Sequence, residues 1–226
     1  MLPFIILIQF LLNSGFILHP FLSGFLCGFP TGALQAHELY RGKRLTGPNY
    51  QALSAIANNA SIGFVLFAVG FAIYKSIKIG WFLLGIQIVT SLLMWLLFYK
   101  KTKKNDLPKQ INNNFSPLTS NFSPFKSSAI IMSIICTTVI FFSCIISILQ
   151  SWCVPPFLTS LLEMTNGIAA VPPLPFASFL LGFGGLCVAF QTFSTCSNIN
   201  KTKYIFLKLT QGIIASLLTF LFLTFF

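Results

Sequence analysis

Apolar runs of membrane-spanning length alternate with short polar segments along most of this chain. A helix needs about 20 predominantly apolar residues to cross a bilayer. Runs that approach or exceed this length lie at 2–18, 50–74, 79–99, 127–150 and 204–226. Three further apolar segments are shorter or interrupted by glycine and proline, at 21–37, 157–171 and 176–193. The pattern predicts an all-α polytopic membrane protein with six to eight membrane segments.

The composition agrees with a membrane protein that lies in a lipid bilayer. The chain is 55% hydrophobic and 8% charged, whereas soluble domains carry about 25% charged residues. It has 14 basic and 3 acidic residues. The basic residues gather in short loops between apolar runs, which is typical of cytoplasmic loops and argues against nucleic-acid binding. The six cysteines show no metal-ligand spacing, so we expect no metal or other cofactor.

A long hydrophilic stretch, 100–126, divides the chain into two membrane halves, 1–99 and 127–226. Its lysines, asparagines and Ser-Pro pairs predict a flexible, basic linker on the cytoplasmic side. In each half, a glycine-broken segment is followed by a polar loop, a tyrosine (Tyr50 or Tyr204) and a spanning run. The two halves therefore resemble an internal repeat.

The two broken segments are the strongest sequence indication of function. Backbone groups freed from a helix at membrane depth must be buried in protein or line a wet cavity. Interrupted segments at corresponding positions of two halves mark the binding site in many transporters. Their half-helix N-termini could hold an anion, or the glycines could instead permit close helix packing. The residues concerned are Gly28, Pro30 and Gly32 in the first segment and Gly182, Gly184 and Gly185 in the second.

Two acidic residues lie close to these segments, Glu38 after the first and Glu163 before the second. An ionisable group at membrane depth costs about 2.5 kcal/mol or more, which favours a functional role. The alternatives are an interfacial surface position for Glu38, beside Arg41, and a structural hydrogen bond to a neighbouring helix for Glu163.

Amide side chains in the apolar runs are also candidates for a solute pathway. They either line that pathway or bond neighbouring helices to one another. They are Asn58, Asn59, Asn166 and Gln191. Paired carboxylates, a Ser/His/Asp set and a phosphate-binding loop are missing from the sequence, so an enzyme is not expected.

The motifs resemble those of one known family. Gly28-Phe29-Pro30-Thr31-Gly32-Ala33, Glu38-Leu39-Tyr40 and Asn58-Asn59-Ala60-Ser61 are similar to the first-half signature of the YlbJ-type sporulation integral membrane proteins, which carry a nucleoside-recognition (Gate) domain. Leu162-Glu163-Met164-Thr165-Asn166-Gly167 and the segment 182–191 are similar to the second-half signatures. The chain departs from the family in having Leu34 where a lysine is usual and Ile62-Gly63 where a proline is usual, and it begins closer to the first motif.

The resemblance implies a bacterial inner-membrane, transporter-like protein of spore-forming Firmicutes. It belongs by this resemblance with proteins that are linked to moving dipicolinic acid across the outer forespore membrane during sporulation. On this hypothesis the glycine breaks receive carboxylates, Asn58, Asn59 and Gln191 bond them, and the two glutamates gate the path or carry a proton. An alternative is a non-transporting assembly or spore-maturation factor with a Gate-like fold. Nucleoside transport rests on the domain name alone. The small number of spans favours a homo-oligomer that encloses the pathway.

Overall fold

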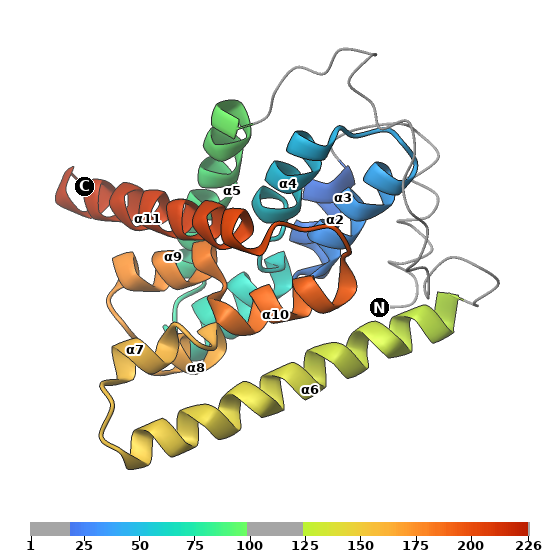
Figure 1. Cartoon of the computed structure of the whole chain (residues 1–226). Coiled ribbons are helices and arrows are strands. Elements are labelled where there is room, and N and C mark those ends of the chain that lie inside the picture. The colour runs from blue at the N-terminus through green and yellow to red at the C-terminus, as the bar shows by residue number, and fades with distance from the viewer. Residues whose placement is uncertain (1–18, 99–123, 226) are drawn as a thin grey trace.

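The computed structural model describes residues 19–98 and 124–225, and all regular secondary structure in these ranges is helical (Figure 1). The expected first span, 2–18, and nearly all of the linker, 100–126, lie outside the described residues. The helices are α2 (His19–Cys27), α3 (Thr31–Arg41), α4 (Gly47–Ile56), the π-helix η1 (Phe64–Ile73), α5 (Ile77–Phe98), α6 (Pro124–Ser151), α7 (Pro156–Ser160), α8 (Met164–Ala169), α9 (Leu174–Phe183), α10 (Gly185–Thr195) and α11 (Lys201–Phe225).

Four helical segments of the described chain are long and apolar enough to cross a membrane, rather than the six to eight expected. They are Ile77–Phe98, Ser128–Ser151, Leu174–Thr195 and Lys201–Phe225. The predictions of spans at 79–99, 127–150 and 204–226 are therefore confirmed as apolar helices of spanning length. The third segment, Leu174–Thr195, consists of α9 and α10 together and contains the predicted break.

The prediction of one continuous span over 50–74 is wrong. Helix α4 ends at Ile56, and η1 begins at Phe64 after a stretch that is largely non-helical. The Asn59 side-chain amide donates to the Ile56 carbonyl at 2.9 Å, which occupies a backbone acceptor that a continuing helix would use. Asparagine side chains compete with the helix in this way. We call this stretch, Ala57–Gly63, the α4–η1 break.

Both glycine-broken segments are interrupted as predicted. Gly28 separates α2 from α3 with φ at 82°, and Gly184 separates α9 from α10 with φ at 81°. Glycine adopts this left-handed backbone conformation without the steric cost that other residues meet. Each segment is therefore a pair of short helices joined at a glycine.

Glycines also allow the elements around the α4–η1 break to approach one another. A Cβ atom on Gly24 of α2, or on Gly32 of α3, would lie 2.0 Å from the Ala57 carbonyl oxygen. On the other side, α11 packs along α9, where a Cβ on Gly182 would lie 2.9 Å from Gly212 Cα. The α4–η1 break therefore lies against α2 and α3. Helix α6 runs along the outside of the molecule (Figure 1).

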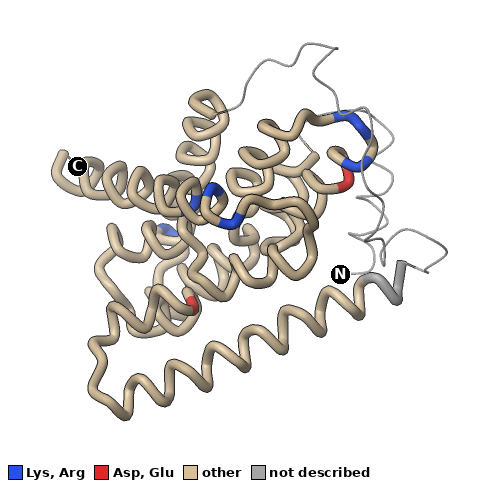
Figure 2. Tube along the Cα trace, viewed as in Figure 1, with Lys and Arg blue, Asp and Glu red and all other residues tan. Residues whose placement is uncertain are grey.

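The surface and the interior have the polarity expected for a protein in lipid. Large apolar side chains are exposed along the outer faces of α5, α6 and α11, among them Trp81, Leu96, Ile140, Leu217 and Phe225. Many polar side chains are buried instead. Most charged positions in the described chain lie at helix ends and in connecting loops (Figure 2). This distribution is compatible with a membrane location.

Candidate functional site

A buried lysine on α11 is the centre of the candidate site. Lys208 is 1% exposed. Its ammonium donates to the Asn58 carbonyl oxygen at 2.8 Å and to Gln211 Oε1 at 3.0 Å. Within the described ranges no carboxylate lies at ion-pair distance from it, since the recorded ion pair joins Arg41 to Glu38. The ammonium therefore has neutral partners for a full positive charge.

A second set of amide and hydroxyl groups extends from Gln211. The Gln211 amide donates to Asn59 Oδ1 at 2.9 Å and to Ser91 Oγ at 3.1 Å. Ser91 in turn donates to the same Asn59 oxygen at 3.2 Å. The α4–η1 break, α5 and α11 are thus joined by one network at the mid-length of α11, in which Gln211 is the eleventh of 25 residues.

Asn58 connects the lysine to the second broken segment. Its amide donates to Thr192 Oγ1 on α10 at 3.0 Å and to the Tyr204 hydroxyl on α11 at 2.8 Å. Its side-chain carbonyl oxygen, Oδ1, is buried and has no hydrogen-bond partner within the described ranges. Asn58 therefore presents one acceptor to Lys208 and leaves a second acceptor unused.

The Phe29 ring joins the two broken segments. The Lys208 ammonium lies 5.5 Å from the centroid of this ring, within the range of a cation–π interaction. A Cβ on Gly184 would lie 3.3 Å from Phe29 Cζ. Phe29, which lies in the first glycine break, is therefore close both to the buried ammonium and to Gly184 in the second glycine break.

The structure brings together about half of the residues predicted from the sequence. Those that lie against the lysine, Phe29 or the α4–η1 break are Gly28, Gly32, Asn58, Asn59 and Gly184. Pro30 is the N-cap of α3, between Gly28 and Gly32. The others lie elsewhere, and they are Glu38, Glu163, Asn166, Gly185 and Gln191. Gln191 is buried and donates to Cys187 Sγ at 3.4 Å on its own helix, and Asn166 donates to Ser143 Oγ on α6 at 3.4 Å.

Glu163 has a structural role in the folded chain. It is the N-cap of α8 and accepts hydrogen bonds from the backbone N–H groups of Thr165 and Asn166, at 3.0 and 2.8 Å. The Thr165 hydroxyl also donates to it. This is the structural hydrogen-bond alternative that the sequence left open, although the partners belong to its own helix.

The N-terminus of α10 is occupied by protein. The backbone N–H groups of Leu186 and Cys187 donate to the carbonyls of Leu161 and Leu162, at 3.0 and 2.8 Å. These amides are the ones that the half-helix hypothesis assigned to an anion. In this conformation they donate to protein carbonyls. Lys208 therefore replaces the glycine break as the candidate contact for an anion.

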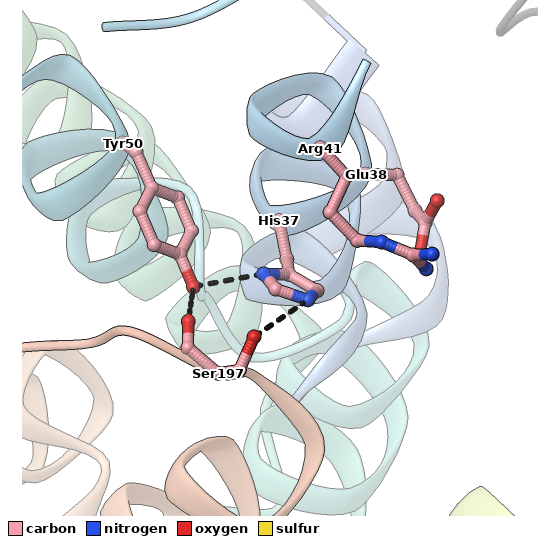
Figure 3. Close-up of polar contacts among 5 residues, drawn as sticks. All are labelled: His37, Glu38, Arg41, Tyr50 and Ser197. Carbon is pink, nitrogen blue, oxygen red and sulfur yellow. Dashed lines mark hydrogen bonds and ion pairs between the residues drawn. The ribbon is translucent and has the colours of Figure 1, made fainter. Parts of the chain in front are cut away.

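A second polar cluster fastens the α10–α11 loop to the first half, at the end of α3 (Figure 3). The Tyr50 hydroxyl donates to the Ser197 carbonyl at 2.7 Å. It therefore accepts from His37 Nδ1, 3.1 Å away, which leaves His37 Nε2 to accept from the Ser197 hydroxyl at 3.4 Å. Burial lowers the pKa of His37 to about 4, which keeps the imidazole neutral, as this arrangement requires. We call His37, Tyr50 and Ser197 the loop latch.

Glu38 lies beside the loop latch rather than in the lysine site. Its carboxylate accepts from Arg41 Nη1 at 3.4 Å, one turn along α3 (Figure 3). Burial raises the pKa of the Glu38 carboxyl, and the nearby Arg41 opposes that rise. Its partly exposed side chain fits the alternative of an interfacial position.

Sequence reasoning missed the residue at the centre of the site. It also missed the partners contributed by α5, α10 and α11, which are Ser91, Thr192, Tyr204 and Gln211. A signal for the lysine was present, because Lys208 stands inside the apolar run 204–226 with Gln211 one turn away. Within the described residues no group of three or more His, Cys, Asp or Glu side chains is placed to hold a metal ion.

Comparisons of the whole chain with protein-family models, with curated proteins and with solved structures found no match.

Proposed function

We propose that this protein is a membrane transport component that binds a small carboxylate anion, most concretely dipicolinate, at Lys208. The observation that carries the proposal is a fully buried ammonium whose partners in the described chain are neutral. The two broken segments and a buried amide network surround it. Such broken segments are typical of solute sites near the middle of transporter spans.

The energetics of a buried charge support an anion as the missing partner. An ionic group away from water is costly unless it is paired and hydrogen-bonded. The bonds to Asn58 and Gln211 join the ammonium to neutral oxygens. A carboxylate would add a full opposite charge, and two opposite charges attract strongly where water is excluded. A solute carboxylate would therefore replace the Asn58 carbonyl or Gln211 Oε1 with a stronger acceptor.

The resemblance to the YlbJ-type family supplies the choice of solute and membrane. On that basis we propose dipicolinate as the anion and the bacterial inner membrane, or the outer forespore membrane, as the location. The family's usual lysine corresponds to Leu34 in this chain. Lys208 contributes a cation from a different helix, so the departure at Leu34 does not remove positive charge from the site.

The test is uptake of radiolabelled dipicolinate by liposomes that contain the purified protein. We expect accumulation above that of empty liposomes, and a loss of about 30-fold or more in the Lys208→Met variant. Truncating one partner of a buried charge pair costs about 2–5 kcal/mol, and about 1.4 kcal/mol corresponds to tenfold. Lys203→Met is the matched control, because it makes the same change on the same helix at an exposed position.

Two outcomes would contradict the proposal. Uptake by the wild type no greater than that of empty liposomes would remove the transport function and favour the assembly-factor alternative. Equal uptake by wild type and Lys208→Met would show that the buried ammonium has no part in solute binding. Thermal unfolding of both variants in detergent separates these results from misfolding.

A further inference from the structure

Gln87, on α5, is buried without a hydrogen-bond partner among the described residues. The residue is 2% exposed, and within residues 19–98 and 124–225 no group bonds its amide nitrogen or its amide oxygen. An unpaired polar group away from water costs about 1–3 kcal/mol. Native proteins contain few such groups, and each calls for an explanation such as a functional role or a bound molecule.

The position of Gln87 connects it to the lysine site. It lies four residues before Ser91, so both side chains are on one face of α5, about 6 Å apart along the axis. Ser91 Oγ accepts from Gln211, which also accepts from Lys208. Gln87 therefore lies one helical turn from Ser91, which belongs to the hydrogen-bonded network of the buried ammonium.

Contacts between α5 and α11 place Gln87 inside the bundle. Ser91 meets Gln211, and the Phe82 and Phe222 rings lie 4.9 Å apart, so the two helices run antiparallel. Gln87 lies between these two contact points on α5. It is the eleventh of 22 residues in α5, and Gly184 is the eleventh of 22 in the segment Leu174–Thr195. The unpaired amide and the second glycine break are both at the mid-length of a span.

We propose that Gln87 is a specificity-determining residue, which binds a second polar group of the solute whose carboxylate binds Lys208. The proposal rests on the proposed function. The substrate class that follows is a small molecule with an anionic group at one end and a hydrogen-bonding group at the other. A simple monocarboxylate fills the lysine end alone.

A purely structural role for Gln87 makes a different prediction. If this amide is only an unsatisfied core group, Gln87→Leu removes its desolvation cost, stabilises the protein and leaves ligand preference unchanged. If the amide binds solute, the same variant loses the preference. Ligand discrimination therefore separates the two roles, whereas stability alone does not.

The experiment measures binding of dipicolinate and benzoate to the purified full chain in detergent by isothermal titration calorimetry. Both probes carry an aromatic ring and a carboxylate, but benzoate lacks a second polar group. We expect the wild type to bind dipicolinate about tenfold more tightly, since one hydrogen bond to a charged group is worth about 1.5–3 kcal/mol. Gln87→Leu should bind the two probes equally, with benzoate affinity close to that of the wild type.

Gln35→Leu is the matched control, because Gln35 is also a buried glutamine with an unpaired Oε1, on α3. It should retain the tenfold preference. A Gln87→Leu variant that keeps the preference would overturn the inference while leaving the lysine site intact. If the wild type binds neither probe, the proposed function itself fails, and with it this inference. Loss of both probes in Lys208→Met together with loss of preference in Gln87→Leu would support both.

Discussion

The chain buries two charged side chains in its second half, and their surroundings differ. Glu163 is 3% exposed, and it accepts hydrogen bonds from Thr165 and Asn166, which follow it by two and three residues in the chain. Lys208 is 1% exposed, and one acceptor of its ammonium comes from Asn58, 150 residues away in the sequence. The carboxylate is stabilised by the N-terminal amides of its own helix, whereas the ammonium contacts two neutral acceptors and an aromatic ring in the part of the chain that the structure describes.

The difference separates a structural charge from a candidate functional one. A carboxylate at a helix N-terminus has favourable partners as soon as that helix forms. An ammonium that depends on a carbonyl from a distant segment requires the assembled bundle, and Lys208 has no carboxylate at ion-pair distance among the described residues. Figure 2 shows the two described acidic positions well apart, one near the end of α3 and one beside α8. Burial of a charge is therefore a weaker indication of function than the absence of a charged partner.

The largest change in stability is expected for Glu163, and this distinguishes it from Lys208. Glu163→Ala should lower the free energy of unfolding by about 1–2 kcal/mol, since it removes the N-cap of α8 and its hydrogen bonds to the part-buried backbone N–H groups of Thr165 and Asn166. Dipicolinate affinity should stay unchanged. Lys208→Met should lose the affinity for dipicolinate, and its stability should change less than that of Glu163→Ala, because removal of the buried charge offsets the cost of leaving the Asn58 carbonyl and Gln211 Oε1 without a donor. Denaturant unfolding and calorimetric titration measure the two quantities.

Glu38→Ala is the control for that comparison. It removes a glutamate whose ion pair is partly exposed, at 28% for its side chain, and exposed pairs are worth less than about 1 kcal/mol. If Glu163→Ala abolished binding of dipicolinate and left the stability unchanged, the assignment of a structural role to Glu163 would be wrong.

A smaller effect is expected from the network that holds the lysine's acceptor. Tyr204→Phe removes the hydroxyl that accepts from the Asn58 amide. The unfolding free energy should fall by about 1 kcal/mol, the usual net value of one hydrogen bond. Affinity for dipicolinate should change less than in Lys208→Met, because the Asn58 carbonyl remains available to the ammonium. An affinity loss equal to that of Lys208→Met would assign Tyr204 a direct contact with solute.

The smallest effect concerns a third buried titratable group, His37 in the loop latch. Its pKa is lowered from 6.5 to about 4 by burial, so between these values the unfolded chain binds more protons than the folded one. The contribution of His37 to stability is complete above about pH 6.5 and is lost as the pH falls toward 4. Unfolding measured over this range should show a decline that is reduced in His37→Phe. An equal decline in both proteins would show that His37 does not titrate in this way.

The sequence alone determined the class of the protein and the places where its helices break. Runs of apolar residues predict spanning helices at 79–99, 127–150 and 204–226, because length and hydropathy suffice to identify a membrane span. The interruptions at Gly28 and Gly184 are local as well, since a left-handed backbone favours glycine whatever surrounds it. The division at the α4–η1 break was missed, although Asn58 and Asn59 stand there.

Only the tertiary structure decided which of the polar residues form a site. Glu163, which stands in an apolar sequence context, satisfies its hydrogen bonds locally, and no sequence pattern gives the atoms that a carboxylate will meet. Lys208 lies near the start of a spanning helix, where a basic residue usually serves as an interfacial anchor. Its burial follows from packing of α11 against the α4–η1 break, from the other half of the chain. Long-range contacts of this kind depend on how the helices assemble, and that information is not contained in the local pattern of either segment.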